Sequence, residues 1–380
     1  MQILPIASGK GGVGKSLVAT NLAIALGQAG KKVILADLDL GASNIHLVLG
    51  MPSINKGIGT FIGNSSVSLE DIMIDSGYEN VRFIPGDAEI PGMANLKASQ
   101  KRSLIRKLSA LEADYLILDL GAGTSNNILD FFLSSSQGII VSAPTLTATL
   151  NAYLFLKNAI FRIMSTSFRR DSEAWKYLEN LRKDGKSLQR VYIPKLLDRM
   201  KDKDTEGYAE FEQRMTHFHP GLIMNLLDDP KDGQKAQKIR RSCKEYLGLE
   251  LEHLGIMYRD HLQDVALNSR LPILVYKPQA VLSQGLFRIA DKILSKFDEE
   301  QAPLDIQDLE DSYLTADLEA EVDFDAKIHE MESMLHAGSL SHGDLIETIK
   351  IQQFELSRLK KENVLLKSRL VKAINSGFKV

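Results

Sequence analysis

The chain has 380 residues, 44% of them apolar and 25% charged, which is enough for a full hydrophobic core and excludes a disordered tail or a collagen-like fibre. A formal charge of −3 gives no global basic field, so contact with nucleic acid would need a local patch or a partner. The single cysteine, Cys243, excludes an intramolecular disulfide and a CxxC pair for zinc or an iron–sulfur cluster. No segment has the apolar length of a membrane span or a signal peptide, so we expect a cytoplasmic protein.

Short apolar runs alternate with helix-length amphipathic runs up to about residue 298. The short runs are rich in Val, Ile and Leu without polar alternation, which is typical of strands buried on both faces. This pattern predicts an α/β fold with a doubly wound, mostly parallel sheet. Pro5 is irregular in a strand because proline cannot donate a ladder hydrogen bond. The predicted strands are 3–7, 32–36, 81–84, 115–118, 138–142, 222–226 and 252–257.

A glycine-rich loop follows the first predicted strand and opens a helix. Its pattern, G-x4-G-K-[ST], is that of a phosphate-binding loop (P-loop), in which backbone N–H groups and the helix N-terminus surround nucleotide phosphates. Lys15 would reach the β- and γ-phosphates, and the Ser16 hydroxyl would hold Mg²⁺. The nucleotide-binding residues predicted here are Gly9, Lys10, Gly11, Gly12, Val13, Gly14, Lys15, Ser16 and Leu17.

Two later strands end in acidic residues. The strand at 32–36 is followed by Asp37 and Asp39, and the strand at 115–118 by Asp119. Carboxylates two residues apart at a strand end point the same way, and beside a triphosphate they favour Mg²⁺ and water. The alternative for each acid is a solvated turn or the end of a buried strand.

The loop GKGGVGKS, with Lys10 early in it, resembles the deviant Walker A motif of the MinD/ParA class of ATPases. The D-x-D-x-G segment at 37–41 looks like the switch I segment of this family, and 119–123 is similar to its Walker B and switch II. The resemblance implies a P-loop ATPase domain over residues 1–297, a doubly wound fold, slow hydrolysis of Mg-ATP and an ATP-dependent homodimer.

The resemblance also implies roles for single residues. Lys10, Lys15 and Asp39 would be the catalytic residues: Lys10 would cross the dimer to the phosphates of the partner, and Asp39 would orient the attacking water. The Mg²⁺ residues would be Ser16, Asp37 and Asp119, and the N–H of Gly123 would contact the γ-phosphate.

Two further stretches match the family with departures. Residues 144–153 look like P-E-x-T-x-x-x-D-A-Y, but Thr145 replaces the usual Glu and Asn151 the usual Asp, so charge is lost on the expected dimer side. Asn225 matches the asparagine that reads adenine in the family. Asp260 ends a Y-R-D triplet where P-x-D is usual.

Two segments do not fit the strand and helix alternation. Residues 162–205 read as a basic helical insertion, since 162–203 hold 12 Lys or Arg against 6 Asp or Glu. It is either a solvated helical face with its own apolar seam or a docking surface for DNA, an anionic membrane or an acidic partner. Residues 298–335 read as an acidic, partly disordered linker, because 298–332 hold 14 acidic residues and one basic one.

A seven-residue repeat follows at 340–376. Position a falls on His342, Ile349, Leu356, Asn363 and Leu370, and position d on Leu345, Gln352, Leu359, Leu366 and Ala373. A lone asparagine at position a favours a parallel two-stranded coiled coil. The alternative is an amphipathic helix that packs on the body or lies on a membrane surface.

Two minor features favour a surface or packing role over chemistry. His217 and His219 have metal-like spacing but no third ligand nearby. Cys243 has basic neighbours, yet the expected role is that of a thiol packed within a helix.

The resemblance favours an ATP-driven dimerisation switch that positions or regulates flagellar, division or partition machinery, with ATP and Mg²⁺ as cofactors and a protein partner. Contact with a membrane surface or DNA through the basic segments stays open, as does a peripheral location at the inner membrane. A second hypothesis is a nucleotide-gated coiled-coil scaffold with vestigial turnover. An iron–sulfur carrier of the Mrp type fits less well because it needs paired cysteines, so we expect no iron–sulfur cluster.

Overall fold

The computed structural model describes residues 1–40, 43–52, 54, 56–86, 96–183, 191–298 and 306–336. The chain divides into two compact units, Met1–Phe324 and Asp325–Val380. Apart from the end of one helix, the second unit lies outside the described residues, and the predicted coiled coil at 340–376 lies there entirely.

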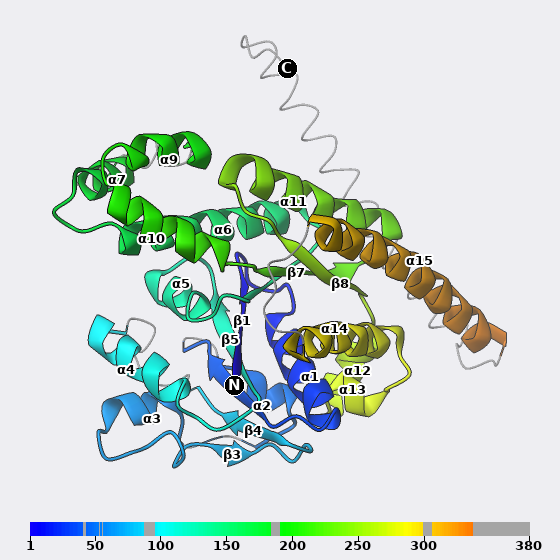
Figure 1. Cartoon of the computed structure of the whole chain (residues 1–380). Coiled ribbons are helices and arrows are strands. Elements are labelled where there is room, and N and C mark those ends of the chain that lie inside the picture. Colours follow the sequence, from blue (N-terminus) through cyan, green and yellow to red (C-terminus); the bar gives the residue numbers. More distant parts are fainter. Residues whose placement is uncertain are drawn as a thin grey trace, which may run out of the picture. The chain divides into compact units, whose positions relative to one another are not determined.

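An eight-stranded sheet forms the centre of the first unit, in the order β3-β4-β2-β5-β1-β6-β7-β8 (Figure 1). All neighbours pair in parallel except β3 and β4, which are antiparallel. The strands are β1 (Gln2–Ser8), β2 (Val33–Leu38), β3 (Ile74–Asp75), β4 (Val81–Ile84), β5 (Tyr115–Ala122), β6 (Ile139–Ser142), β7 (Gly221–Leu227) and β8 (Glu252–Tyr258). All seven predicted strands are present, and the two-residue edge strand β3 was not predicted. Pro5 is tolerated in β1, whose pairing with β6 begins one residue later, at Ile6.

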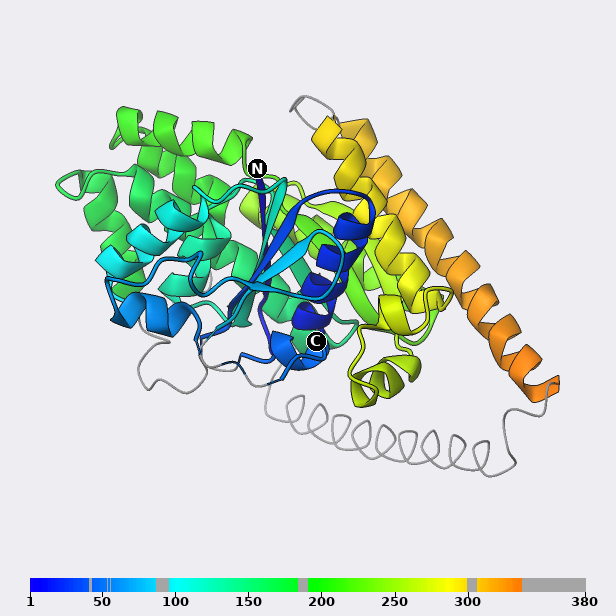
Figure 2. The same ribbon diagram turned by 90° about the horizontal axis from the view of Figure 1, so that it is seen from below.

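Helices cover both faces of the sheet (Figures 1 and 2). Alternate residues of β2 show why: Val33 and Leu35 pack with one set of helices, and Ile34 and Ala36 pack with the other. The first set is α1 (Lys15–Gln28) and α14 (Val281–Asp298), and the second is α4 (Ala98–Leu108), α5 (Asn126–Phe132), α6 (Leu146–Ser167) and α11 (Gln234–Leu247). The shorter elements are α2 (Ile45–Val48), α3 (Ile58–Gly63), η1 (Pro230–Gly233), α12 (Leu262–Asn268) and α13 (Ile273–Tyr276). None of the described helices combines the length and apolarity that crossing a membrane requires.

The predicted insertion is helical and consists of α7 (Glu173–Lys183), α9 (Ile193–Lys201) and α10 (Thr205–Thr216), drawn in green beside α6 (Figure 1). It extends further than the sequence indicated, and α10 adds Glu206, Glu210 and Glu212, which offset part of the basic excess. Several of its apolar side chains belong to the main core, including Ala174, Ile193 and Phe211. These features favour the solvated face with an apolar seam.

The prediction of a partly disordered linker is wrong for residues 306–335, which lie within α15 (Ile306–His336). Composition alone missed the apolar positions at helical spacing, Leu309, Tyr313, Ala316 and Ala320, all of which are buried. Tyr313, Ala316 and Ala320 pack in the same core cluster as residues of β8 and α11. The acidic helix therefore folds because other elements supply its apolar partner surface.

Candidate nucleotide-binding site

The glycine-rich loop lies between the carboxyl end of β1 and the N-terminus of α1, at the centre of the parallel sheet. In open α/β sheets this is the edge at which ligands bind. Gly12 (φ 77°) and Gly14 (φ 89°) are left-handed, a conformation that favours glycine, and Gly14 caps α1. The Ser8 hydroxyl donates to the Lys10 carbonyl (2.7 Å), which fixes the start of the loop.

Two other glycines hold the loop against its surroundings. A Cβ atom at Gly9 would lie 2.0 Å from the carbonyl oxygen of Asn151, so only glycine allows α6 to approach this closely. The N–H of Gly123 donates to the Ser8 carbonyl (3.1 Å), and Gly123 is left-handed (φ 99°). The predicted switch II glycine therefore binds the P-loop strand directly.

Asp37 is fully buried at the end of β2 and has three donors. The Ser43 hydroxyl (2.6 Å) and the Ile45 N–H (3.3 Å) donate to Oδ2, and the Asp39 N–H (3.1 Å) donates to Oδ1. Burial raises the pKa of Asp37, and these bonds oppose the rise. Ser43 was not predicted, because nothing in its spacing from Asp37 indicates a contact. Asp39 is half-buried, and a Cβ atom at Gly121 would lie 3.1 Å from its Oδ1.

Asp119 lies opposite Asp37 in the register of β2 and β5 and is 1% exposed. Within the described part of the chain, no hydrogen bond of good geometry reaches either of its carboxylate oxygens. Burial raises the pKa of Asp119, and the positive charge of Lys15 and the nearby Ser16 hydroxyl oppose the rise. A buried carboxylate without donors is costly, so this position suits a cation. Lys15 is buried (8% exposed) and Ser16 half-buried, so the predicted Mg²⁺ and phosphate residues converge here.

Lys10 is exposed, and its Nζ donates to the Thr147 hydroxyl (3.1 Å) at the start of α6. Thr145, which stands where the family has Glu, caps this helix through a bond from the Ala148 N–H (3.3 Å). Leu146 and Leu150 on the same turns are 84% and 53% exposed. An apolar surface therefore flanks Lys10, the lysine predicted to reach across the dimer.

The remaining predicted nucleotide residues lie in different settings. Val13 is buried, and Leu17 is partly buried against the core around α1. Asn225 is 2% exposed and bonded within the protein, so its adenine contact stays a prediction. The Asp260 carboxylate accepts from the Leu262 N–H (2.9 Å) and caps the turn before α12.

His217 is exposed, His219 is half-buried and Cys243 is fully buried. His217 Nδ1 lies 2.7 Å from the Gln213 carbonyl, and burial lowers the pKa of His219. Cys243 is fully buried in α11, and burial raises the pKa of its thiol to about 12. Among the described residues, no group of three or more His, Cys, Asp or Glu is arranged to hold a metal ion.

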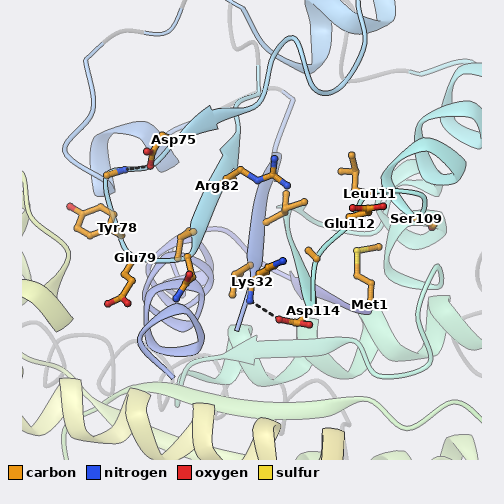
Figure 3. A pocket seen from close by; sticks show the side chains of 16 residues that line it. Met1, Lys32, Asp75, Tyr78, Glu79, Arg82, Ser109, Leu111, Glu112 and Asp114 are labelled. Atoms are coloured by element: carbon orange, nitrogen blue, oxygen red, sulfur yellow. Dashed lines mark hydrogen bonds between the residues drawn. The ribbon is translucent and has the colours of Figure 1, made fainter. Parts of the chain in front are cut away.

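A hollow of about 1100 Å³ lies at the opposite end of the sheet, below the amino ends of β2, β4 and β5 (Figure 3). Its walls carry charges of both signs, including Lys32, Arg82 and Asp75. Asp114 accepts from the backbone N–H of Lys32 (2.7 Å). We do not assign the nucleotide to it, because parallel sheets bind ligands at their carboxyl ends.

Residues 1–159 match the model of the ParA family, described as NUBPL iron-transfer P-loop NTPase. Residues 1–159 are thus identified as a ParA-family P-loop NTPase domain. The antiactivator FleN of Pseudomonas aeruginosa is 30% identical over 159 residues, which are 41% of this chain and 56% of FleN. The septum site-determining protein MinD of Synechocystis is 32% identical over 156 residues, which are 40% of this chain and 56% of that protein. The chain thus spans about half the length of these curated relatives.

The solved structure of MinD with Mg-ADP from Pyrococcus horikoshii has the same fold. It superposes with a TM-score of 0.53 at 21% identity, and the match covers 79% of this chain and 99% of that one. The MinD fold therefore extends over most of this chain, beyond the matched residues 1–159.

Proposed function

We propose that this protein is a Mg-ATP-binding and slowly hydrolysing dimerisation switch of the MinD/ParA type. The observation that carries the proposal is Asp119, a buried carboxylate that no described residue bonds with good geometry, beside Lys15 and Ser16 at the start of α1. A magnesium ion bridged to nucleotide phosphates would supply the missing positive charge there. Lys15 and the loop N–H groups would hold the phosphates, with Ser16, Asp37 and Asp119 around the ion.

The dimer part of the proposal rests on the surface around Lys10. A cation exposed beside Leu146 and Leu150 suits burial against a second copy, since large exposed apolar side chains often mark interaction sites. With Thr145 and Asn151 in place of acidic residues, no carboxylate at these two positions competes with phosphate for the Lys10 ammonium group. Closure of two copies over ATP would then couple nucleotide state to dimer state.

The biological task proposed is to position or regulate a cellular structure. The names of the relatives, an antiactivator and a septum site-determining protein, support regulation and positioning as the class of task. An iron-transfer role is suggested by the description of the family model. The only cysteine, Cys243, is buried in α11, so it is poorly placed to bridge a cluster between two copies.

Asp39→Ala is the variant that tests the switch. Asp37 accepts from the backbone N–H of Asp39, so the substitution leaves that bond in place. We expect the variant to bind Mg-ATP, to release phosphate at least tenfold more slowly, as loss of a general base does, and to stay dimeric for longer. Phosphate release and light scattering after size exclusion would be measured on both forms, with Asp198→Ala as the control, because Asp198 is an exposed acid on α9.

Two results would contradict the proposal. Wild-type turnover in the Asp39→Ala form would remove the water-orienting role of Asp39. If the oligomeric state of the wild-type protein does not change when ATP is added, the result would argue against the switch and favour the coiled-coil scaffold.

A further inference from the structure

The end of β7 contacts the P-loop through one buried side chain. Asn225 is 2% exposed, and its Nδ2 donates to the carbonyl oxygen of Val13 (2.9 Å) inside the loop. Its Oδ1 accepts from the backbone N–H of Leu226 (2.8 Å). A carbonyl can only accept and an N–H can only donate, so these two partners define the orientation of the amide. Both ends of the side chain are thus engaged by the protein.

The backbone around Asn225 is strained. Leu226 has φ 63°, a left-handed conformation that is unfavourable for a residue with a branched side chain. The register between β7 and β8 shifts between Met224 and Leu227 at the same point. This irregular turn presents the Leu226 N–H to Asn225, and partly buried packing of Leu226 in the core holds the turn in place.

Gly14 completes the arrangement from the other side. A Cβ atom at this position would lie 2.2 Å from Asn225 Nδ2, so glycine makes room for the amide as well as for the left-handed cap of α1. Val13 and Gly14 directly precede Lys15. The Asn225 amide therefore contacts the loop where its backbone turns into the helix that carries Lys15 and Ser16.

We propose that Asn225 is a positioning residue that holds the P-loop backbone at Val13 in its phosphate-binding conformation. It therefore acts on the triphosphate part of any nucleotide instead of selecting the base. This inference rests on the proposed function only in assuming that the loop binds phosphates.

Asn225→Asp tests it with almost no change of shape. The donor at Nδ2 becomes an acceptor that faces the Val13 carbonyl, so the bond is lost and repulsion replaces it. We expect the affinities for Mg-ATP, Mg-GTP and Mg-tripolyphosphate to fall by the same factor, about tenfold or more. Hydrogen exchange of the Gly9–Ser16 amides should also be faster in the nucleotide-free protein. Calorimetry below the unfolding midpoint would measure these affinities. Asn225→Ala removes the donor without adding charge, and it should also lower the affinities for all three ligands by one common factor.

The matched control is Asn21→Asp. Asn21 is also fully buried, donates from Nδ2 to the Leu17 carbonyl (2.8 Å) and accepts from the Leu274 N–H (3.2 Å), but it lies in the body of α1. Its substitution should lower stability without selectively accelerating exchange in Gly9–Ser16.

The outcomes separate the inference from the proposed function. If Asn225→Asp weakens ATP but leaves tripolyphosphate unchanged, Asn225 reads the base and the inference is overturned. Unchanged exchange in Gly9–Ser16 would overturn it too. If the wild type binds none of the three ligands, the proposed function fails, and the exchange experiment still decides whether Asn225 holds the loop.

Discussion

The P-loop end of the sheet and the α15 side differ in the kind of buried polar group that lacks a partner. At the P-loop, the Asp119 carboxylate is buried close to Lys15 without a hydrogen bond of good geometry from the described residues. Along α15, the Tyr313 hydroxyl donates to the Leu251 carbonyl (2.8 Å) and the Tyr258 hydroxyl donates to the Ala320 carbonyl (2.7 Å). The His253 ring on this side has no partner among the described residues, but burial lowers its pKa and keeps it neutral. An ionisable carboxylate left unpaired favours a ligand, whereas a neutral ring and internally bonded hydroxyls favour stability. Substitutions in the two regions should therefore separate binding from folding.

Lys15→Ala should have the largest effect, mainly on binding. Loss of the buried ammonium group removes the charge that faces the phosphates, and we expect the affinity for Mg-ATP to fall at least 100-fold, the loss of a charge-assisted contact of about 3 kcal/mol. Titration with a fluorescent ATP analogue would measure it. Without nucleotide, Asp119 can take up a proton in place of the lost positive charge, so the free energy of unfolding should change less than the binding free energy does. Lys238→Ala on the exposed face of α11 is the control, and an equal loss in both variants would contradict the prediction.

Tyr313→Ala should have the reverse effect. Tyr313 is 1% exposed, stacks on His253 at 5.0 Å and lies under the guanidinium of Arg240. We expect the free energy of unfolding to fall by about 3–5 kcal/mol, as for other large aromatic truncations, with nucleotide affinity retained below the unfolding midpoint. Leu314→Ala is the neighbouring control. Leu314 is 62% exposed, so its truncation should lower the free energy of unfolding by less than about 0.5 kcal/mol. Equal losses at both positions would mean that α15 does not pack on the sheet as described.

His253 should add a smaller, pH-dependent effect on the same side. It is 1% exposed, and burial lowers its pKa to about 3, with a further contribution from Lys292. Between pH 6.5 and about 3 the unfolded chain binds a proton that the folded chain excludes, so stability at this site is full above pH 6.5 and is lost as the pH falls. The loss approaches about 1.4 kcal/mol per pH unit.

Urea unfolding at pH 7.5, 6.0 and 5.0 would measure this contribution as the difference between the wild type and His253→Gln. The variant should lose less stability on acidification. If the wild type and the variant lose stability equally on acidification, the pKa of His253 is the same in the folded and unfolded chains, and the prediction is wrong.

Sequence predicted the P-loop side well and the α15 side poorly, for physical reasons. Glycines with fixed spacing, a buried strand and a terminal acid are local constraints, so Gly14, Lys15 and Asp119 could be placed without knowing their neighbours. Burial of α15 depends on β8 and α11, which supply an apolar partner surface. The acidic composition of α15 gives no sign of that surface. The contact of Asn225 with Val13 was missed because a backbone carbonyl as partner leaves no mark in the pattern of side chains.

Helix α15 also decides how the sheet can be extended. Strand β8 is an edge strand, and α15 supplies partners to its backbone: the Ser312 hydroxyl accepts from the His253 N–H (3.3 Å), and Tyr313 binds the carbonyl of the preceding Leu251. The opposite edge is β3, which is only two residues long. An edge that is covered and an edge that is short are both poor templates for a strand from another chain. We therefore expect that copies of this protein do not join through a continuous sheet, and that the proposed dimer would use helices and loops instead.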